Sequence, residues 1–348
     1  MTDKQQLLSD FKFYSSYSKF KKEDERMETW GEAIDRVMQM HYKKYQNKIT
    51  PELQEYLDFA TKQYKEKRIL GSQRALQFGG DSILKHEMKQ FNCLVSYCDR
   101  IEFFKEAMYL LLCGCGVGFS VQTLHVEKLP MIGKRIEGVK TFLIEDSIEG
   151  WADAIGVLLA SYSLSDIKFQ DYYGYRIDFD YSNIRPKGSY ISGGFKAPGY
   201  EGLKNSLTKI QELLDKEING NVQIPFKSII AYDVVMHMAD AVLSGGVRRS
   251  ATICLFSATD NDMLNAKTGD WYIKNPQRGR SNNSVILIRN KTSKELFSKI
   301  MESVKSWGEP GFVWSSNEDI IYNPCVEIGM TPYYIDGNED KISGWEGC

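Results

Sequence analysis

The chain has 348 residues, of which 42% are hydrophobic and 26% are charged, and its formal net charge is -2. This composition is typical of a soluble globular protein with one large domain or two domains. The balance of acidic and basic residues argues against nucleic acid or a membrane surface as a partner, and no run of 18 apolar residues predicts a membrane span. Seven cysteines, unevenly spaced, do not form the pattern of a secreted disulfide framework, so we expect a reducing, cytoplasmic setting.

The predicted elements change in character along the chain. Residues 1–71 are rich in charge, and Trp30, Ile34 and Val37 recur there at helical spacing, so this part is predicted to be a helical N-terminal region. From residue 72 onward, short apolar runs alternate with amphipathic helices. The predicted strands are 91–95, 251–256 and 285–288, and the predicted helices follow Asp99 and span 231–243. This alternation favours an α/β architecture with largely parallel strands.

The stretch from about residue 122 to 230 interrupts that rhythm. It contains aromatic and glycine-rich segments such as Tyr172-Tyr173-Gly174-Tyr175. We therefore interpret it as an insertion into the second region, 72–348.

Cysteines and glycines mark two further segments. Cys113-Gly114-Cys115 suggests a metal site, but none of the four histidines lies at ligand spacing from these cysteines, so no metal site is predicted. The segment Gly245-Gly246-Val247-Arg248-Arg249-Ser250 lies between a predicted helix and a predicted strand. Its glycines free the backbone, and its arginines have the geometry to bind a base or a phosphate, although a solvated loop has the same composition.

The segment Asn323-Pro324-Cys325-Val326-Glu327 places an amide, a thiol and a carboxylate at alternating positions. In an extended or tightly looped segment these three side chains share one face, and Pro324 prevents a helix there. The group combines a thiol that can carry a radical or a thiolate, an orienting amide and a proton acceptor. A turn with a buried cysteine is the alternative that this motif alone leaves open.

Several segments together resemble the monomeric, adenosylcobalamin-dependent (class II) ribonucleotide reductases. The similar segments occur in the same order in that family and extend through nearly the whole chain: 74–81, 92–93, 109–121, 184–188, 193–199, 244–251 and 323–328.

The resemblance implies a fold and a set of catalytic residues. The fold would be the N-terminal half of a ten-stranded α/β barrel with a central finger loop. By resemblance, Cys325 at the tip of that loop forms a thiyl radical that abstracts the ribose 3′ hydrogen, and Glu327 accepts the 3′-hydroxyl proton. Asn323 would hold the ribose hydroxyls. Cys93 and Cys348 would supply protons and two electrons as the 2′-hydroxyl leaves, and would end as a disulfide.

The same resemblance implies ligands and partners. Asn92 and Gly118 join Asn323 in binding the ribonucleotide substrate, and residues 245–250 form the loop that responds to a deoxynucleotide triphosphate effector. The insertion at about 122–230 would replace a dimer partner in building the effector site. The cofactor would be adenosylcobalamin, and an external dithiol such as thioredoxin would re-reduce the disulfide.

Family members continue for several hundred residues past the position that matches Cys348. We therefore expect a fragment of a split enzyme that needs a C-terminal fragment for activity, in the cytoplasm of a bacterium or, if phage-encoded, of its host. Two alternatives stay open from the sequence. One is a fragment of a class I large subunit, and the other is a non-catalytic fragment that binds the nucleotide effector.

Overall fold

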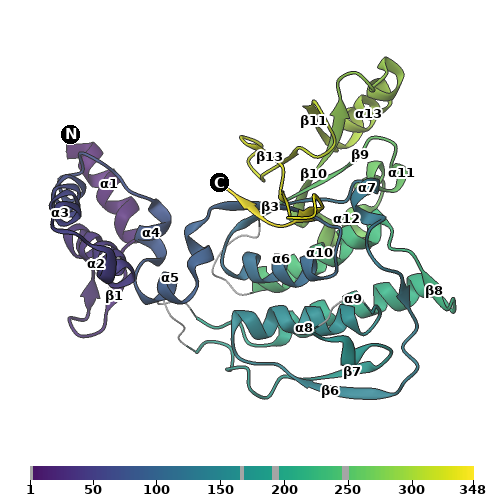
Figure 1. Ribbon diagram of the computed structural model, residues 1–348, viewed down its shortest axis with the longest axis horizontal. Helices are drawn as coiled ribbons and strands as arrows, with labels where there is room; N and C mark the ends of the chain where they lie inside the picture. The colour runs from purple at the N-terminus through teal and green to yellow at the C-terminus, as the bar shows by residue number, and fades with distance from the viewer. Residues whose placement is uncertain (1–2, 165–167, 190–195, 245–250) are drawn as a thin grey trace. The chain divides into compact units, whose positions relative to one another are not determined.

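The computed structural model describes residues 3–164, 168–189, 196–244 and 251–348, and it divides into two compact units (Figure 1). The first unit runs up to Asn92, and the second begins at Cys93. The predicted domain boundary at 71/72 and the interpretation of 122–230 as an insertion stay predictions.

The first unit is mainly helical, as the pattern of its apolar residues predicts. Helix α2 begins at a capping box, in which the Thr29 side chain accepts a hydrogen bond from the Glu32 backbone while the Glu32 carboxylate accepts one from the Thr29 backbone. Ile34 and Val37 of this helix are buried in a core with Tyr64 of α3. The elements are α1 (Asp3–Ser16), β1 (Phe20–Lys21), β2 (Arg26–Met27), α2 (Trp30–Tyr45), η1 (Gln46–Lys48), α3 (Pro51–Lys65), α4 (Gln73–Phe78), α5 (Asp81–Lys85) and η2 (Glu87–Gln90).

The second unit is built on a six-stranded sheet with the order β11-β10-β9-β4-β3-β16. Five of these strands are parallel, and only β16 pairs antiparallel with its neighbour. Every residue of β3 and β4 is buried, as in a parallel sheet covered on both faces. The strands are β3 (Cys93–Tyr97), β4 (Gly116–Ser120), β9 (Thr252–Ser257), β10 (Ser281–Ile288), β11 (Gly311–Ser315) and β16 (Glu346–Gly347).

The α/β class with mainly parallel strands is thereby confirmed. Over the described residues the sheet is open, with β11 and β16 at its edges, so the half barrel stays a prediction. The helices next to the sheet are α6 (Glu102–Leu112) and α10 (Ser228–Ser244), with α8 (Ile148–Ala160) and α9 (Glu201–Ile218) packed against them (Figure 1). Helix α6 begins three residues after Asp99, whose carboxylate instead accepts a hydrogen bond from Ser343.

Short elements complete the second unit. Four two-stranded pairings lie outside the main sheet: β5 (Ile132–Gly133) with β8 (Gln223–Ile224), β6 (Val139–Leu143) with β7 (Arg176–Asp180), β12 (Ile321–Tyr322) with β13 (Gly329–Met330), and β14 (Tyr333–Ile335) with β15 (Lys341–Ser343). The remaining helices are α7 (Thr123–Val126), η3 (Gln170–Tyr172), α11 (Asn261–Leu264), α12 (Trp271–Lys274), η4 (Pro276–Arg280) and α13 (Lys294–Trp307). Within the described ranges, no helix combines the length and the apolar character that a membrane span requires.

Candidate active site

The motif around Cys325 forms the tip of a finger. Strands β12 and β13 pair antiparallel, and residues 323–328 connect them. The turn is closed by a hydrogen bond of 2.8 Å from the Val326 N–H to the Asn323 carbonyl. Val326 has a φ of 60°, a left-handed conformation that is unfavourable for a β-branched residue. Such backbone strain is typical of functional loops.

Glycines of β4 let the finger lie directly against the sheet. A Cβ atom on Gly118 would lie 2.5 Å from the Tyr322 carbonyl oxygen, which is closer than atoms approach without a shift. At Gly116 it would lie 3.2 Å from both Cys93 Sγ and a ring carbon of Pro324. The close approach of the finger therefore explains glycine at Gly118. The predicted contact of Gly118 with substrate stays a prediction.

The amide of Asn323 links the two ends of the motif. Asn323 is fully buried, and its Nδ2 donates a hydrogen bond of 2.8 Å to Glu327 Oε1. Its Oδ1 accepts from the Ile328 N–H at 3.2 Å. The same Nδ2 lies 3.9 Å from Cys348 Sγ. The buried amide thus orients the carboxylate, whereas Cys325 itself is exposed at the tip.

Three thiols meet at this point. The Cys348 N–H donates to the Cys93 carbonyl at 3.0 Å, which extends the pairing of β16 with β3. The thiols of Cys325 and Cys348 both lie within hydrogen-bonding reach of the Cys93 thiol. The structure therefore brings together the five residues that the resemblance assigned to catalysis, including Asn323 and Glu327.

The environment of Cys93 and Cys325 favours the protonated form of these two thiols. Burial, followed by the neighbouring Cys348 and Cys325 thiols, raises the pKa of Cys93 to about 12. Partial desolvation and then the negative charge of Glu327 raise the pKa of Cys325 above its ordinary value. A nucleophilic cysteine would instead have a lowered pKa. The arrangement favours reactions of the neutral thiol, namely loss of a hydrogen atom or donation of a proton.

The segment that carries Cys348 is anchored by an aromatic side chain. The Trp345 ring stacks on Phe103 of α6 with centroids 5.6 Å apart and an interplanar angle of 11°. Its Nε1 donates to Glu106 Oε2 at 2.8 Å. In addition, Ser96 Oγ donates to the Gly344 carbonyl at 2.6 Å. This tail has no periodic apolar pattern, so Trp345 is the one signal in it that sequence reasoning could have used.

The remaining predicted residues are not part of this cluster. Asn92 is exposed and directly precedes Cys93. The predicted effector loop, residues 245–250, lies outside the described residues. No group of three or more His, Cys, Asp or Glu side chains within the described ranges has an arrangement suited to a metal ion.

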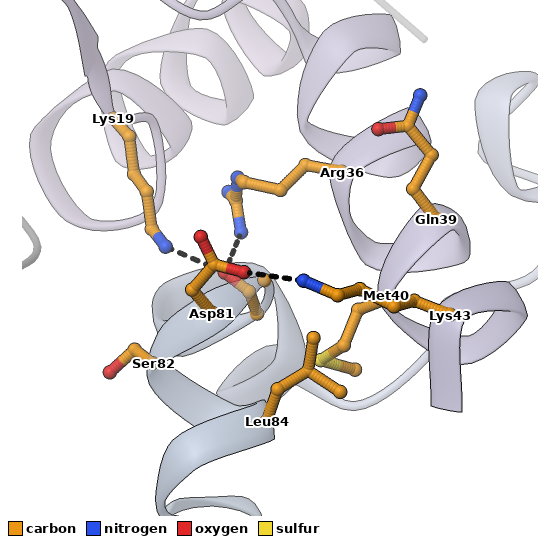
Figure 2. A pocket seen from close by; sticks show the side chains of 10 residues that line it. Lys19, Arg36, Gln39, Met40, Lys43, Asp81, Ser82 and Leu84 are labelled. Atoms are coloured by element: carbon orange, nitrogen blue, oxygen red, sulfur yellow. Dashed lines mark hydrogen bonds and ion pairs between the residues drawn. The ribbon is translucent and has the colours of Figure 1, made fainter.

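A pocket of about 460 Å³ in the first unit contains none of the predicted residues (Figure 2). Its cationic side chains are already engaged. The Arg36 guanidinium binds the Glu28 carboxylate and donates to the Gly79 carbonyl at 3.1 Å, and Lys19 Nζ donates to the same carbonyl at 2.7 Å. Burial, and then the charge of Arg36, lower the pKa of Lys19 to about 8. These contacts brace the turn that leads into α5.

No model of a known protein family matches the chain. Its sequence is 28% identical to a probable adenosylcobalamin-dependent ribonucleoside-triphosphate reductase of Dictyostelium discoideum, over 98% of this chain and 46% of that protein. A putative enzyme of the same description from Mycobacterium phage D29 is 24% identical over 91% of this chain and 53% of the phage protein. The adenosylcobalamin-dependent ribonucleoside-triphosphate reductase of Euglena gracilis is 24% identical over 89% of this chain and 43% of its own length.

The fold comparison agrees with the sequences. The crystal structure of a B12-dependent (class II) ribonucleotide reductase superposes with a TM-score of 0.76 at 22% identity, covering 92% of this chain and 53% of that one. The chain thus spans about half the length of the curated relatives it matches. In sequence it is a relative of the adenosylcobalamin-dependent ribonucleoside-triphosphate reductases, and its fold matches about half of a class II ribonucleotide reductase.

Proposed function

We propose that the chain provides the radical cysteine, the proton acceptor and the reducing thiol pair of a ribonucleotide reductase that converts ribonucleotides to 2′-deoxyribonucleotides. One observation carries the proposal. The thiols of Cys93, Cys325 and Cys348, from three separate parts of the sequence, meet beside the hydrogen-bonded pair of Asn323 and Glu327. Such a cluster has one thiol for radical transfer and two for reduction.

The roles follow from the chemistry of each group. The sulfur radical of Cys325 takes the hydrogen atom from C3′ of the ribose, and the Glu327 carboxylate accepts the 3′-hydroxyl proton. The buried amide of Asn323 holds that carboxylate in place. Cys93 and Cys348 then give up two protons and two electrons and form a disulfide, while the 2′-hydroxyl leaves as water. Return of the 3′-hydroxyl proton from Glu327 and of the hydrogen atom from Cys325 to C3′ completes the turnover.

The cofactor proposed is adenosylcobalamin, after which the relatives are named. When bound, it supplies the radical that removes the hydrogen atom from the Cys325 thiol. The residues present fit that requirement, because Cys325 is exposed while Asn323 beneath it is fully buried. The raised pKa of Cys325 also keeps its sulfur as the thiol, the form that holds the hydrogen atom.

Further partners belong to the proposal as well. Since the chain spans about half of its relatives, turnover is proposed for this chain together with a polypeptide corresponding to their remaining half. The open edge at β11, where Phe312 and Trp314 are exposed, supports an added partner there. A deoxynucleotide effector would act through residues 245–250, and an external dithiol such as thioredoxin would reduce the Cys93–Cys348 disulfide.

Reduction of ribonucleotides, measured with adenosylcobalamin, a dithiol and the complementing C-terminal polypeptide, tests this function. We expect Cys325→Ser to abolish turnover, because a hydroxyl does not form the sulfur radical, and to leave thermal unfolding nearly unchanged, because the side chain is exposed. Ile328→Val, an exposed position on the same loop, is the control and should retain activity. Substantial turnover by Cys325→Ser would remove Cys325 from the proposed role.

A further inference from the structure

Two backbone carbonyls at the base of the finger are held by buried side chains. The Tyr97 hydroxyl, at the end of β3, donates a hydrogen bond of 2.5 Å to the Asp319 carbonyl. Gln122, just beyond β4, donates from Nε2 to the Glu318 carbonyl at 2.9 Å. Residues 318 and 319 directly precede β12, the strand that leads to Cys325. The base of the finger is therefore held at the ends of two neighbouring strands, β3 and β4.

A polar network orients these two donors. Gln122 Nε2 also donates to Ser120 Oγ at 3.1 Å, and Ser120 Oγ lies 2.8 Å from His125 Nδ1. Burial lowers the pKa of His125 to about 3, so its ring is neutral and Nδ1 can accept the hydroxyl proton of Ser120. The Tyr97 ring stacks on His125 with centroids 4.0 Å apart and an interplanar angle of 20°. All four side chains are buried, so each donor has one fixed direction.

We propose that Tyr97 and Gln122 are positioning residues that set the place of the Cys325 thiol relative to Cys93. The proposal rests on the role of Cys325 given above, but its geometry is independent of turnover. Strand β3 carries Cys93 at one end and Tyr97 at the other, so one rigid strand holds both the target thiol and the anchor of the finger.

The segment between residues 318–319 and Cys325 is short. Strand β12 has only two residues, it pairs with an equally short β13, and the loop beyond it is largely exposed. Ile321 of β12 is buried in one core cluster with Tyr97. Loss of the Tyr97 hydroxyl at the Glu318–Asp319 base therefore acts on the strand that leads directly to Cys325. Misplacement of a reacting group by about 1 Å is enough to slow a reaction about a hundredfold.

Disulfide trapping measures that placement directly. In a Cys348→Ser background, diamide takes two hydrogen atoms from the Cys93 and Cys325 thiols and is itself reduced to the hydrazine, leaving a Cys93–Cys325 disulfide. We expect Tyr97→Phe to slow this reaction by about tenfold, a moderate fraction of the loss that full misplacement causes. Peptide mapping identifies the disulfide, and thermal unfolding is recorded in parallel.

The matched control is Tyr232→Phe. Tyr232 is also buried in the second unit, and its hydroxyl also donates to a backbone carbonyl, that of Arg278 at 3.1 Å. Its hydroxyl lies 3.0 Å from Ser281 Oγ, so its partners belong to η4 and β10 and not to the base of the finger. Slower trapping in Tyr97→Phe alone supports the proposal. Equal rates in both variants and the parent, or equal slowing in both variants, overturn it.

A second variant and the independence of trapping from turnover allow the trapping result to be interpreted. If Tyr97→Phe does not fold, Gln122→Met, which removes the amide and keeps the volume, replaces it and should also slow trapping. Because trapping uses neither substrate nor cofactor, it separates this proposal from the proposed function. Active Cys325→Ser enzyme with slow trapping in Tyr97→Phe would refute the function and leave the positioning intact.

Discussion

At the scale of single residues, the site depends on groups whose chemistry is set by their neighbours. Asn323 directs the Glu327 carboxylate, and that carboxylate in turn raises the pKa of the exposed Cys325 thiol. The motif made the three residue types predictable, because they alternate around a proline. The pairing of Asn323 with Glu327 was not predictable, because it depends on the left-handed turn at Val326.

Replacing Glu327 should make Cys325 more reactive towards alkylation. Desolvation and, after it, the negative charge of Glu327 raise the pKa of Cys325, so Glu327→Gln should lower that pKa and increase the thiolate fraction at pH 8. Iodoacetamide labelling of Cys325, followed by peptide mass mapping, should be faster in Glu327→Gln than in the parent. Glu339→Gln, on the turn between β14 and β15, is the control. An unchanged or slower rate in Glu327→Gln would contradict the electrostatic account.

At the scale of elements, the finger and the C-terminal strand both reach the start of β3. The parallel strands were predictable from short apolar runs, although β3 begins at Cys93 and not at the predicted residue 91, because the apolar Phe91 is exposed. The pairing of β16 with β3 could not be predicted from local patterns. It involves only Glu346 and Gly347, and two residues show no alternation. The resemblance alone indicated that Cys348 meets Cys93.

Gly118→Ala should displace the finger. The added methyl group would lie 2.5 Å from the Tyr322 carbonyl oxygen. Because this oxygen belongs to the backbone, a change of side-chain rotamer cannot relieve the clash. We expect a loss of about 1–3 kcal/mol in the free energy of unfolding measured in urea. Gly344→Ala, where a Cβ atom would meet nothing within 4 Å, should change that free energy little. A Gly118→Ala protein as stable as the parent would show that the finger does not press on β4.

Trp345 should control how readily Cys348 meets Cys93. Removing its stack on Phe103 and its hydrogen bond to Glu106 costs about 2 kcal/mol of local stability. In a Cys325→Ser background, Trp345→Ala should therefore slow diamide formation of the Cys93–Cys348 disulfide. Trp307→Ala, at the exposed end of α13, is the control and should leave the rate unchanged. Equal rates in the two variants would mean that β16 stays paired without the Trp345 anchor.

At the scale of the whole molecule, the main sheet has a free edge at β11. Among the residues that the structure describes, this strand pairs with β10 alone, and Phe312 and Trp314 are exposed on it. The half barrel implied by the resemblance has an open edge, but which strand forms that edge was not predictable, because a parallel strand at an edge and one at the centre have similar apolar runs. An exposed apolar edge is a site where natural proteins add a partner or else aggregate.

This edge should make the chain alone prone to self-association. Phe312→Lys places a charge on β11 and should reduce the concentration dependence of apparent mass in light scattering, since an edge lysine opposes strand addition. Tyr334→Lys makes a similar change at an exposed aromatic on β14, away from the main sheet, and serves as the control. If both substitutions reduce association equally, the effect comes from charge in general, and the β11 edge is not the contact.

The hydrogen bond from Ser96 Oγ to the Gly344 carbonyl has a consequence for the order of folding. These residues are 248 positions apart in sequence, so the contact closes nearly the longest loop in the chain. Contacts of such separation form late, because the entropy of closing the loop must be offset by structure already in place. We therefore expect Cys348 to approach Cys93 late, when β16 pairs with β3. We expect this separation in sequence to keep the two thiols apart during early folding, so that the topology opposes a premature disulfide.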